Sequence, residues 1–363
     1  MNVVFCGGGT AGHITPAIAI ADALKEKHPD AVITFIGRDK GKENEIIKNA
    51  GYALKTIPIK GLSRSFTLKN LTAIKLALQS IVSAKKILKE IKCDIVIGTG
   101  GYVSWPVITA AHHLKIPSIV HESNAAIGLS TSLLSKKCKY LLLGSDIKTK
   151  YKNAIYTGNP IRKDFEIQSQ NQFRKKLGID LHKKLILSVG GSIGAKKLND
   201  ECIKIMKNYS VKEKNVAHVH ICGSRYYDEI SVYEKDLCKG YGNCRIIAFV
   251  SDMAGALSES DVVISRCGAM TLAEIAFTGA ASILVPSPNV ADNHQLKNAR
   301  YFELNNAALL VTEDKIETLF EKTKLLIEDD KTRKKLKINS KKLSKDNATS
   351  QCVQIIESTI QNG

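Results

Sequence analysis

The chain has 363 residues, of which 44% are hydrophobic and 24% are charged. It is too long for one typical core, has no apolar run of membrane-spanning length and begins without the basic and apolar stretches of a signal peptide. We therefore expect two soluble domains kept in the cytoplasm. The formal net charge of +18 favours an anionic partner, namely nucleic acid, an anionic membrane or a phosphorylated ligand, or it reflects only a lysine-rich surface.

Short apolar runs alternate with amphipathic stretches along the whole chain. Most runs are continuously apolar, which is typical of parallel strands buried on both faces. Helical stretches such as 16–27 and 68–91 separate them, so the pattern predicts doubly wound α/β sheets. The expected strands are 3–6, 31–36, 94–97, 118–120 and 140–143, followed by 184–189, 217–222, 245–250, 261–264, 282–285 and 307–311.

This alternation of strands and helices occurs in two series. Each series opens with a strand followed by a glycine-rich turn, at 7–12 and at 190–194. This repetition predicts two Rossmann-like domains joined near 157–165, where glycine and proline interrupt the pattern. We place the first domain at 1–162 and the second at 163–345, with a last helical run at about 346–363.

The first glycine turn fits G-x-G-x-x-G at Gly7, Gly9 and Gly12. Backbone N–H groups at such a turn, with the following helix dipole, favour an anion such as phosphate. The match alone also fits a nicotinamide dehydrogenase, or a loop that only packs a strand against a helix. His13 follows directly, and a helix N-terminus disfavours its cationic form, so it is either a general base or a structural hydrogen-bonding residue. Pro16 is expected in the first turn of that helix.

Two further polar segments of the first half follow predicted strands: 98–104, which contains two glycines before Tyr102, and 121–124, which reads His-Glu-Ser-Asn. Ligands of open α/β sheets bind outside the carboxyl ends of the strands, so these segments should converge with the first turn on one site. The alternative for His121 and Glu122 is a buried pair that orients a loop.

In the second half, the segment 265–274 follows a strand and opens a helix. In one interpretation its N–H groups face a diphosphate and Glu274 binds a ribose diol. In the other, Thr271 and Glu274 form a capping box. The segment 292–295, Asp-Asn-His-Gln, supplies polar side chains suited to sugar hydroxyls.

No motif predicts a metal or a cofactor. The nine cysteines form no Cys-x-x-Cys pair, so we expect buried thiols. There is no Asp-x-Asp pair to hold a metal-bound nucleotide sugar, and helix N-termini would then stabilise a leaving diphosphate.

The expected helix 68–91 carries apolar residues at helical spacing among many lysines. The apolar positions are Leu71, Ile74, Leu78 and Ile81, and the basic ones are Lys69, Lys75, Lys85, Lys86 and Lys89, with Arg64 before the helix and Lys136, Lys137 and Lys139 elsewhere in the same half. Such a helix either docks on an anionic bilayer or packs its stripe on the core with a basic face in water.

Together these segments resemble the MurG family, whose members transfer N-acetylglucosamine (GlcNAc) from UDP-GlcNAc to undecaprenyl-pyrophosphoryl-MurNAc-pentapeptide (lipid I) to form lipid II of peptidoglycan synthesis. Seven motifs fall in family order, which is a highly specific match. They are 8–16, 100–104, 121–124, 158–162, 190–195, 265–274 and 292–295.

The resemblance implies a GT-B fold, in which two Rossmann-like domains face across a cleft and the last helix returns to the first domain. It implies an inverting reaction without metal or cofactor, at the cytoplasmic face of the cell membrane, with the first domain toward the lipid. His13 would be the base, supported by His121 and Glu122. The acceptor would bind at Gly9, Gly100, Gly101, Tyr102 and Ser104. UDP-GlcNAc would bind at Thr10, Ala11, Gly12, Asn124, Arg162, Ser192, Val250, Ala269, Met270, Thr271, Leu272, Ala273, Glu274 and Gln295.

The chain departs from the family pattern at Ala11, Ser123, Ile193 and His294, which changes the side chains available for contacts at these positions. Three other kinds of protein compete with this interpretation. One is another GT-B enzyme, such as a UDP-GlcNAc 2-epimerase or a transferase with another acceptor. The others are a dehydrogenase and a nucleic-acid-binding protein. The dehydrogenase leaves the second glycine-rich domain without a role. No motif supports specific nucleic-acid binding, and aromatic residues make up only 6%.

Overall fold

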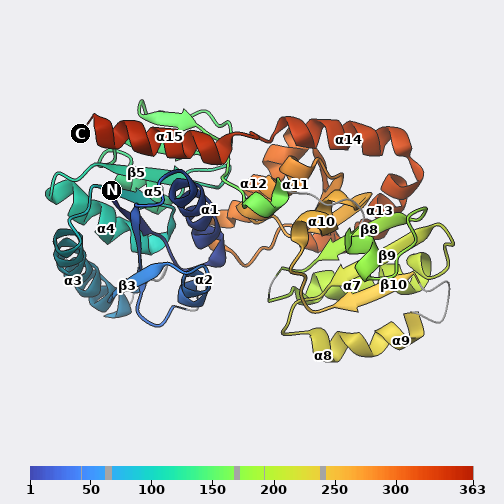
Figure 1. The fold of residues 1–363 in the computed structure, drawn as a ribbon. Helices are drawn as coiled ribbons and strands as arrows, with labels where there is room; N and C mark the ends of the chain where they lie inside the picture. Colours follow the sequence, from blue (N-terminus) through green and yellow to red (C-terminus); the bar gives the residue numbers. More distant parts are fainter. Residues whose placement is uncertain (42, 62–67, 167–171, 192, 238–242, 363) are drawn as a thin grey trace. The chain divides into compact units, whose positions relative to one another are not determined.

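The computed structural model describes residues 1–41, 43–61, 68–166, 172–191, 193–237 and 243–362. The chain forms two compact units: Met1–Arg162 with Lys345–Gly363, and Lys163–Ser344. Each is built around its own parallel sheet (Figure 1).

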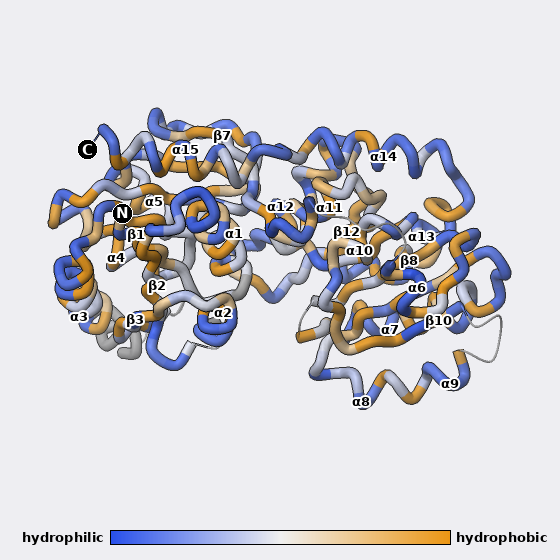
Figure 2. Tube along the Cα trace, viewed as in Figure 1, coloured by the Kyte–Doolittle hydropathy of each residue, from blue (hydrophilic) through white to orange (hydrophobic). Residues whose placement is uncertain are grey.

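The first unit contains a sheet of seven parallel strands among its described residues, in the order β3-β2-β1-β4-β5-β6-β7. The central strands are buried along their length, and Figure 2 shows β1 and β2 coloured as hydrophobic. The sequence pattern missed β3 and β7 because these edge strands are only partly buried and lack a continuous apolar run. The strands are β1 (Asn2–Cys6), β2 (Val32–Arg38), β3 (Ala53–Ile57), β4 (Ile95–Gly98), β5 (Ser118–Glu122), β6 (Tyr140–Leu143) and β7 (Ala154–Tyr156).

Helices cover both faces of this sheet. On one face α15 packs against α1, and Cys352, Val353 and Ile356 of α15 join the core formed by β1 and α1 (Figure 1). The last helix of the chain is therefore part of the first unit. The helices are α1 (Ala11–Lys27), α2 (Glu43–Asn49), α3 (Leu68–Glu90), α4 (Gly101–His113), α5 (Leu129–Leu134) and α15 (Ala348–Gln361).

The second unit contains a sheet of six parallel strands among its described residues, in the order β10-β9-β8-β11-β12-β13. One predicted strand, 245–250, is shorter and starts earlier than expected, since Phe249 is 67% exposed in the loop after β10. The strands are β8 (Lys184–Val189), β9 (Val216–Ile221), β10 (Cys244–Ile247), β11 (Val262–Ser265), β12 (Ser282–Leu284) and β13 (Ala308–Leu310).

The helices of the second unit include short segments and one π-helix, Met206–Ser210, that continues α7. The α-helices are α6 (Gln172–Lys176), α7 (Lys196–Ile205), α8 (Tyr227–Ile230), α9 (Glu234–Leu237), α10 (Met253–Ser258), α11 (Ala269–Thr278), α12 (His294–Leu304), α13 (Leu319–Glu328) and α14 (Asp330–Lys342).

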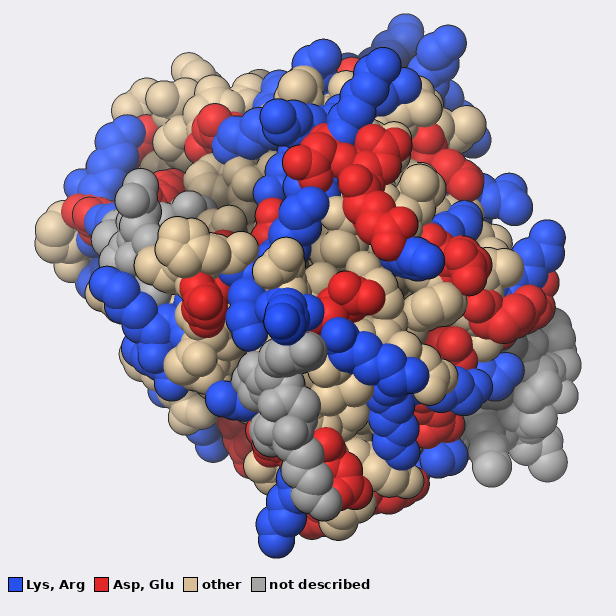
Figure 3. Space-filling view, turned by 90° about the vertical axis from the view of Figure 1, so that its right-hand side faces the viewer, with Lys and Arg blue, Asp and Glu red and all other residues tan. Residues whose placement is uncertain are grey.

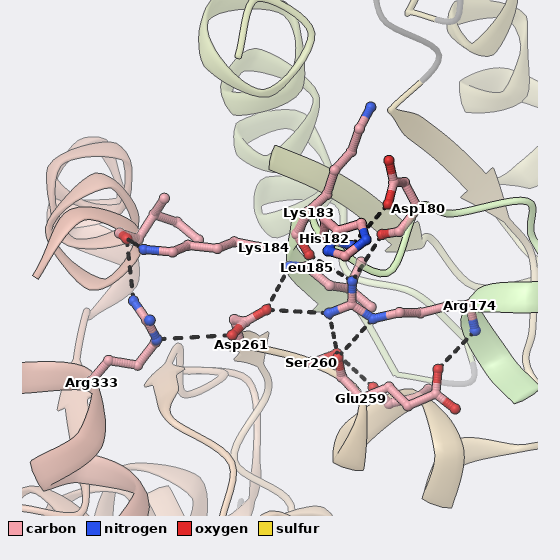
Figure 4. A network of polar contacts seen from close by, with 12 residues as sticks. Arg174, Asp180, His182, Lys183, Lys184, Leu185, Glu259, Ser260, Asp261 and Arg333 are labelled. Carbon is pink, nitrogen blue, oxygen red and sulfur yellow. Dashed lines mark hydrogen bonds and ion pairs between the residues drawn. The ribbon is translucent and has the colours of Figure 1, made fainter. Parts of the chain in front are cut away.

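A network of hydrogen bonds and ion pairs lies at the amino-terminal ends of β8 and β11 (Figure 4). Buried Arg174 donates to the carbonyl oxygens of Glu259 and Lys183, and its Nη2 lies 3.3 Å from Asp261 Oδ2. Asp261 also accepts the N–H of Leu185 at 2.9 Å. Because ligands of such sheets bind at the carboxyl ends, this network belongs to the stability of the unit.

The lysine-rich segment 331–345 has an inward row of basic residues at intervals of four. Arg333, Lys337, Lys341 and Lys345 donate to the carbonyl oxygens of Leu326, Ser260, Phe277 and Tyr156, respectively. Three of these carbonyls lie at or just beyond the C-termini of α13, α10 and α11, where cations are stabilised by the helix dipole. Part of the positive net charge therefore stabilises the fold. On the face drawn in Figure 3, basic and acidic side chains are interspersed.

Candidate functional site

Three loops of the first unit follow β1, β4 and β5, which are adjacent in the sheet. Parallel strands bring their carboxyl ends to one edge, so the segments 7–13, 99–102 and 122–128 lie together, as the sequence predicted. The loop between β1 and α1 includes Gly9, with φ of +91°, and exposed Thr10 at the N-cap of α1.

His13 lies in the first turn of α1, half-buried, against the second glycine loop. A Cβ built on Gly100 would lie 2.7 Å from Nδ1 of His13, so only glycine allows the ring this position. Thr99 donates its hydroxyl to the carbonyl oxygen of His13 at 2.6 Å. Pro16 is not in the first turn as expected, because α1 already begins at Ala11.

Tyr102 packs its ring on two glycines. A Cβ on Gly9 would lie 3.1 Å from the ring, and one on Gly61 would lie 3.3 Å from it. Ser104, in contrast, is fully buried, and its hydroxyl donates to the carbonyl oxygens of Cys6 and Gly100. Ser104 therefore shapes the glycine loop from inside, and the structure does not support the direct acceptor contact that was expected of its side chain.

His121 is fully buried at the end of β5. Its Nε2 lies 3.3 Å from the carbonyl oxygen of Gly158, which can only accept, so Nε2 carries the proton and Nδ1 faces the Ser123 hydroxyl at 3.3 Å. Burial lowers the pKa of His121. The ring is thus a neutral link between β5 and the segment after β7.

The carboxylate of Glu122 organises the loop that follows β5. One oxygen accepts the backbone N–H and the side-chain amide of Asn124 at 3.2 and 2.9 Å. The other accepts Gly128 N–H and the Thr131 hydroxyl at 3.0 and 2.7 Å. With four donors, this buried group holds Asn124 in place. The alternative weighed from the sequence, a residue that orients a loop, describes this geometry.

In the second unit, the segment after β11 opens α11 with Gly268 as N-cap. The capping-box interpretation of Thr271 and Glu274 is wrong, because the helix begins two residues before Thr271. Ala269, Met270 and Thr271 form the first turn, whose N–H groups have no partner within the helix. A Cβ built on Gly268 would lie 3.7 Å from the Thr271 hydroxyl, which places this hydroxyl at the helix start.

The predicted donor residues of α11 differ in what they can offer a ligand. Met270 and Leu272 have buried side chains, and Leu272 N–H already donates to Gly268 O at 3.0 Å. Leu272 therefore does not fit a direct contact. Ala269, Thr271, Ala273 and Glu274 are partly exposed, and a carboxylate such as that of Glu274 has the chemistry to accept hydrogen bonds from a ribose diol.

Gln295, on α12, joins two loops of the proposed donor site by hydrogen bonds. Its Oε1 accepts the backbone N–H groups of Cys267 at 3.2 Å and Ser287 at 2.9 Å, so a sugar contact by Gln295 would have to come from its Nε2. Asp292 and Asn293 before it both have positive φ, and His294 Nδ1 lies 2.8 Å from Ala291 O. Val250 follows β10 and is half-buried, as is Arg162 at the end of the first unit. Ser192 and Arg64 lie outside the described residues.

Sequence reasoning missed several residues that build these loops. Thr99 and Thr131 contact His13 and Glu122 through hydroxyl groups, and Asn298 donates to Cys267 O at 3.1 Å. Asn298 stands three residues after Gln295, so both lie on one face of α12, and that spacing was the available signal. Hydroxyl partners from distant loops leave no such pattern.

Two units, each with a parallel sheet and glycine-rich loops after its strands, have the architecture of the GT-B fold. The glycosyltransferase family 28 N-terminal domain matches residues 3–142, and the family's C-terminal domain matches residues 185–352. The UDP-N-acetylglucosamine–N-acetylmuramyl-(pentapeptide) pyrophosphoryl-undecaprenol N-acetylglucosamine transferase of Thermoanaerobacter sp. (strain X514) is 38% identical over 365 residues, covering 99% of this chain and 100% of the relative. The chain belongs to glycosyltransferase family 28 and, within it, to the MurG family.

A solved structure agrees with this assignment. The crystal structure of Acinetobacter baumannii MurG matches 98% of this chain and 99% of its own, with a TM-score of 0.78 and 27% identity. A UDP-GlcNAc 2-epimerase from Neisseria meningitidis bound to UDP-GlcNAc has a TM-score of 0.67, covers all of both chains and is 16% identical, which shows a shared fold only.

Metal-binding clusters and membrane-spanning helices are both absent among the described residues. No group of three or more His, Cys, Asp or Glu side chains in this part of the chain could hold a metal ion. None of the described helices is both long enough and apolar enough to cross a membrane.

Proposed function

We propose that the chain transfers GlcNAc from UDP-GlcNAc to the 4-hydroxyl of MurNAc in lipid I, with inversion and without metal, at the cytoplasmic face of the cell membrane. The observation that carries the proposal is identity of 38% over the full length with a transferase of this activity. The two sets of loops supply the chemistry that the reaction needs.

The first unit would bind the acceptor. N–H groups of the glycine loops at Gly9, Gly100 and Gly101 suit a diphosphate, and Tyr102 packs on Gly9 beside them. His13 would take the proton from the acceptor hydroxyl as that oxygen attacks the anomeric carbon and UDP leaves. Its place beside Gly100 supports this role, because Thr99 and the loop fix the turn that carries it.

The second unit would bind the donor. The N–H groups at the start of α11, which have no partner within the helix, and the helix dipole favour the diphosphate, whose negative charge increases as UDP leaves. Glu274 would bind the ribose, and Val250, Arg162 and Ser192 would contribute to nucleotide binding by their positions in the family motifs. Thr10, Ala11, Gly12 and Asn124 would contact the sugar.

We also propose that the first unit docks on an anionic membrane through α3, α4 and α5, which pack on one another. Leu78 and Val82 of α3 are 59% and 68% exposed, and Leu129 and Leu133 of α5 are 70% and 55% exposed. Lysines accompany them: Lys137 Nζ lies 5.7 Å from the Trp105 ring. The positive charge of Lys85, and to a smaller extent desolvation and Lys137, lower the pKa of the exposed His113, so positive charge gathers here. Exposed apolar side chains among lysines suit an anionic bilayer.

The membrane proposal is tested by sedimentation with anionic and neutral vesicles. Replacing Leu129 and Leu133 by Asn should reduce binding to anionic vesicles, and high salt should weaken it further. Leu304, 81% exposed on the second unit, offers the matched control, and Leu304→Asn should leave binding unchanged. Equal binding by all three proteins would overturn the assignment of this surface.

The reaction is tested by supplying UDP-GlcNAc labelled in the sugar with a short-chain lipid I analogue. Labelled disaccharide lipid is the expected product. Conversion of UDP-GlcNAc to its 2-epimer without any acceptor would instead identify the 2-epimerase alternative. Binding of UDP-GlcNAc without either product would leave a transferase with a different acceptor.

A further inference from the structure

An ion pair in the second unit lies directly behind the proposed donor site. Glu313 begins a 3₁₀ helix (Glu313–Thr318) after β13, and its carboxylate pairs with the guanidinium of Arg266. Arg266 follows β11, two residues before the N-cap of α11. Both side chains are largely buried, at 12% and 14% exposure, and Lys197 Nζ lies 4.0 Å from the second oxygen of Glu313.

Arg266 connects the carboxyl ends of three neighbouring strands. It leaves β11, donates through Nη1 to the carbonyl oxygen of Val285 after β12 at 3.1 Å, and meets Glu313 after β13. The next residue, Cys267, is held at both backbone groups, by Gln295 at its N–H and by Asn298 at its carbonyl oxygen. The main chain that leads into α11 is thus fixed on each side by a side chain from elsewhere.

We propose that Glu313 is a positioning residue for donor binding: it holds Arg266 across the strand ends and so fixes the N–H groups at the start of α11 that receive the donor diphosphate. The inference rests on the proposed donor site. Fixed dipoles stabilise charge because they do not have to reorient. Even a small increase in the mobility of this turn should therefore weaken diphosphate binding. Removing the carboxylate also leaves the guanidinium buried without its partner, which favours a shift of Arg266 and of the turn.

A purely structural ion pair makes a different prediction, and the same strand offers the control. Asp261, at the other end of β11, pairs with Arg174 at 3.3 Å and with Arg333 at 4.0 Å (Figure 4). Asp261→Asn breaks a partly buried ion pair of the same unit, at the opposite end of β11 from the donor loop. If such pairs act only through stability, Glu313→Gln and Asp261→Asn should affect donor binding alike.

The experiment measures UDP and UDP-GlcNAc binding by calorimetry, steady-state kinetics and thermal unfolding on the full chain. For Glu313→Gln we expect Kd for UDP and KM for UDP-GlcNAc to rise about tenfold while kcat changes by less than about threefold. Glu313→Asp, which keeps the carboxylate, should recover most of the binding. Asp261→Asn should lower the melting temperature and leave Kd unchanged.

Unchanged UDP binding by Glu313→Gln, or an equal loss in Asp261→Asn, would overturn the proposal. If Glu313→Gln does not fold, Arg266→Lys tests the same link, since lysine cannot donate to both Val285 O and Glu313 in the fork geometry of arginine. UDP binding is read without acceptor, so failure of lipid I as a substrate would be seen separately in the wild-type transfer assay.

Discussion

The imidazole of His13 and the backbone of Gly100 occupy adjoining space, so that a single added Cβ on Gly100 would come within 2.7 Å of Nδ1. The two residues are far apart in sequence and meet because β1 and β4 are neighbours in the sheet. The position of the proposed base therefore depends on a glycine of the loop proposed to bind the acceptor diphosphate.

Gly100→Ala should lower kcat by about a hundredfold, because displacing a catalytic group by about 1 Å can cost that much. Gly51→Ala is the matched control: Gly51 also has positive φ, at +80°, but its added Cβ would meet nothing within 4 Å. The control should lose about 1 kcal/mol of stability from backbone strain and keep its kcat. Equal activity of both variants in the transfer assay would show that the His13–Gly100 contact is unimportant.

Thr99→Val should reduce kcat about tenfold while UDP binding stays unchanged. The substitution keeps the shape of the side chain and removes the hydroxyl that donates to His13 O at 2.6 Å, so the turn bearing His13 loses an anchor. Thr99→Ser retains the hydroxyl and should stay within about threefold of wild type. A serine variant as impaired as the valine variant would point to packing instead.

Glu122→Gln should lower both activity and melting temperature. Its amide would place N–H groups against some of the four donors now bound by the carboxylate, and the loop carrying Asn124 would lose its order. Because Glu122 acts on the loop, the residual activity should show the pH–rate profile of wild type at reduced amplitude. A missing limb in that profile would instead identify Glu122 as a proton-transfer group.

Acid should destabilise the second unit through two buried histidines of β9. The Ser188 hydroxyl lies 2.8 Å from His218 Nε2 and 2.7 Å from His220 Nδ1. Burial lowers the pKa of His218 to about 3 and that of His220 to about 4. Both are lowered below the unfolded value of about 6.5, so only the unfolded chain takes up their protons between pH 6.5 and 4.

The free energy of unfolding should therefore fall by about 1.4 kcal/mol per pH unit for each histidine over that range. Chemical denaturation between pH 7 and 4.5 measures this slope. In His218→Gln or His220→Gln, the slope should decrease by the contribution of one proton. It should stay unchanged in His182→Gln, because His182 is an exposed loop residue. If neither buried-site variant changed the slope, another group would be responsible.

The sequence was sufficient for the architecture apart from the edge strands β3 and β7, because parallel strands buried on both faces leave continuous apolar runs, as at 95–98 and 184–189. It also predicted which loops meet, since glycine turns followed β1 and β4. It could not distinguish a residue that contacts a ligand from one that holds a loop. Glu122 and Ser104 occur inside family motifs, yet their hydrogen bonds are made to the protein itself.

Long-range partners explain what the pattern missed. In the sequence, Glu313 lies in an acidic turn with no feature that distinguishes it. Its ion pair with Arg266 is seen only in the structure, where Glu313 follows β13. The basic segment 331–345 gave no reason to separate Lys337 and Lys341 from their neighbours. In the structure, both cap carbonyl oxygens, and burial, the largest effect, lowers the pKa of Lys337.

The proposed reaction and its base are tested most directly by GlcNAc transfer from UDP-GlcNAc to the lipid I analogue by wild type and His13→Ala, both with EDTA present. We predict transfer by the wild type despite EDTA and a loss of about a hundredfold or more in the variant, with UDP binding unchanged. No transfer by a wild-type protein that still binds UDP-GlcNAc would contradict the proposed acceptor. Full activity of His13→Ala would contradict the assignment of the base.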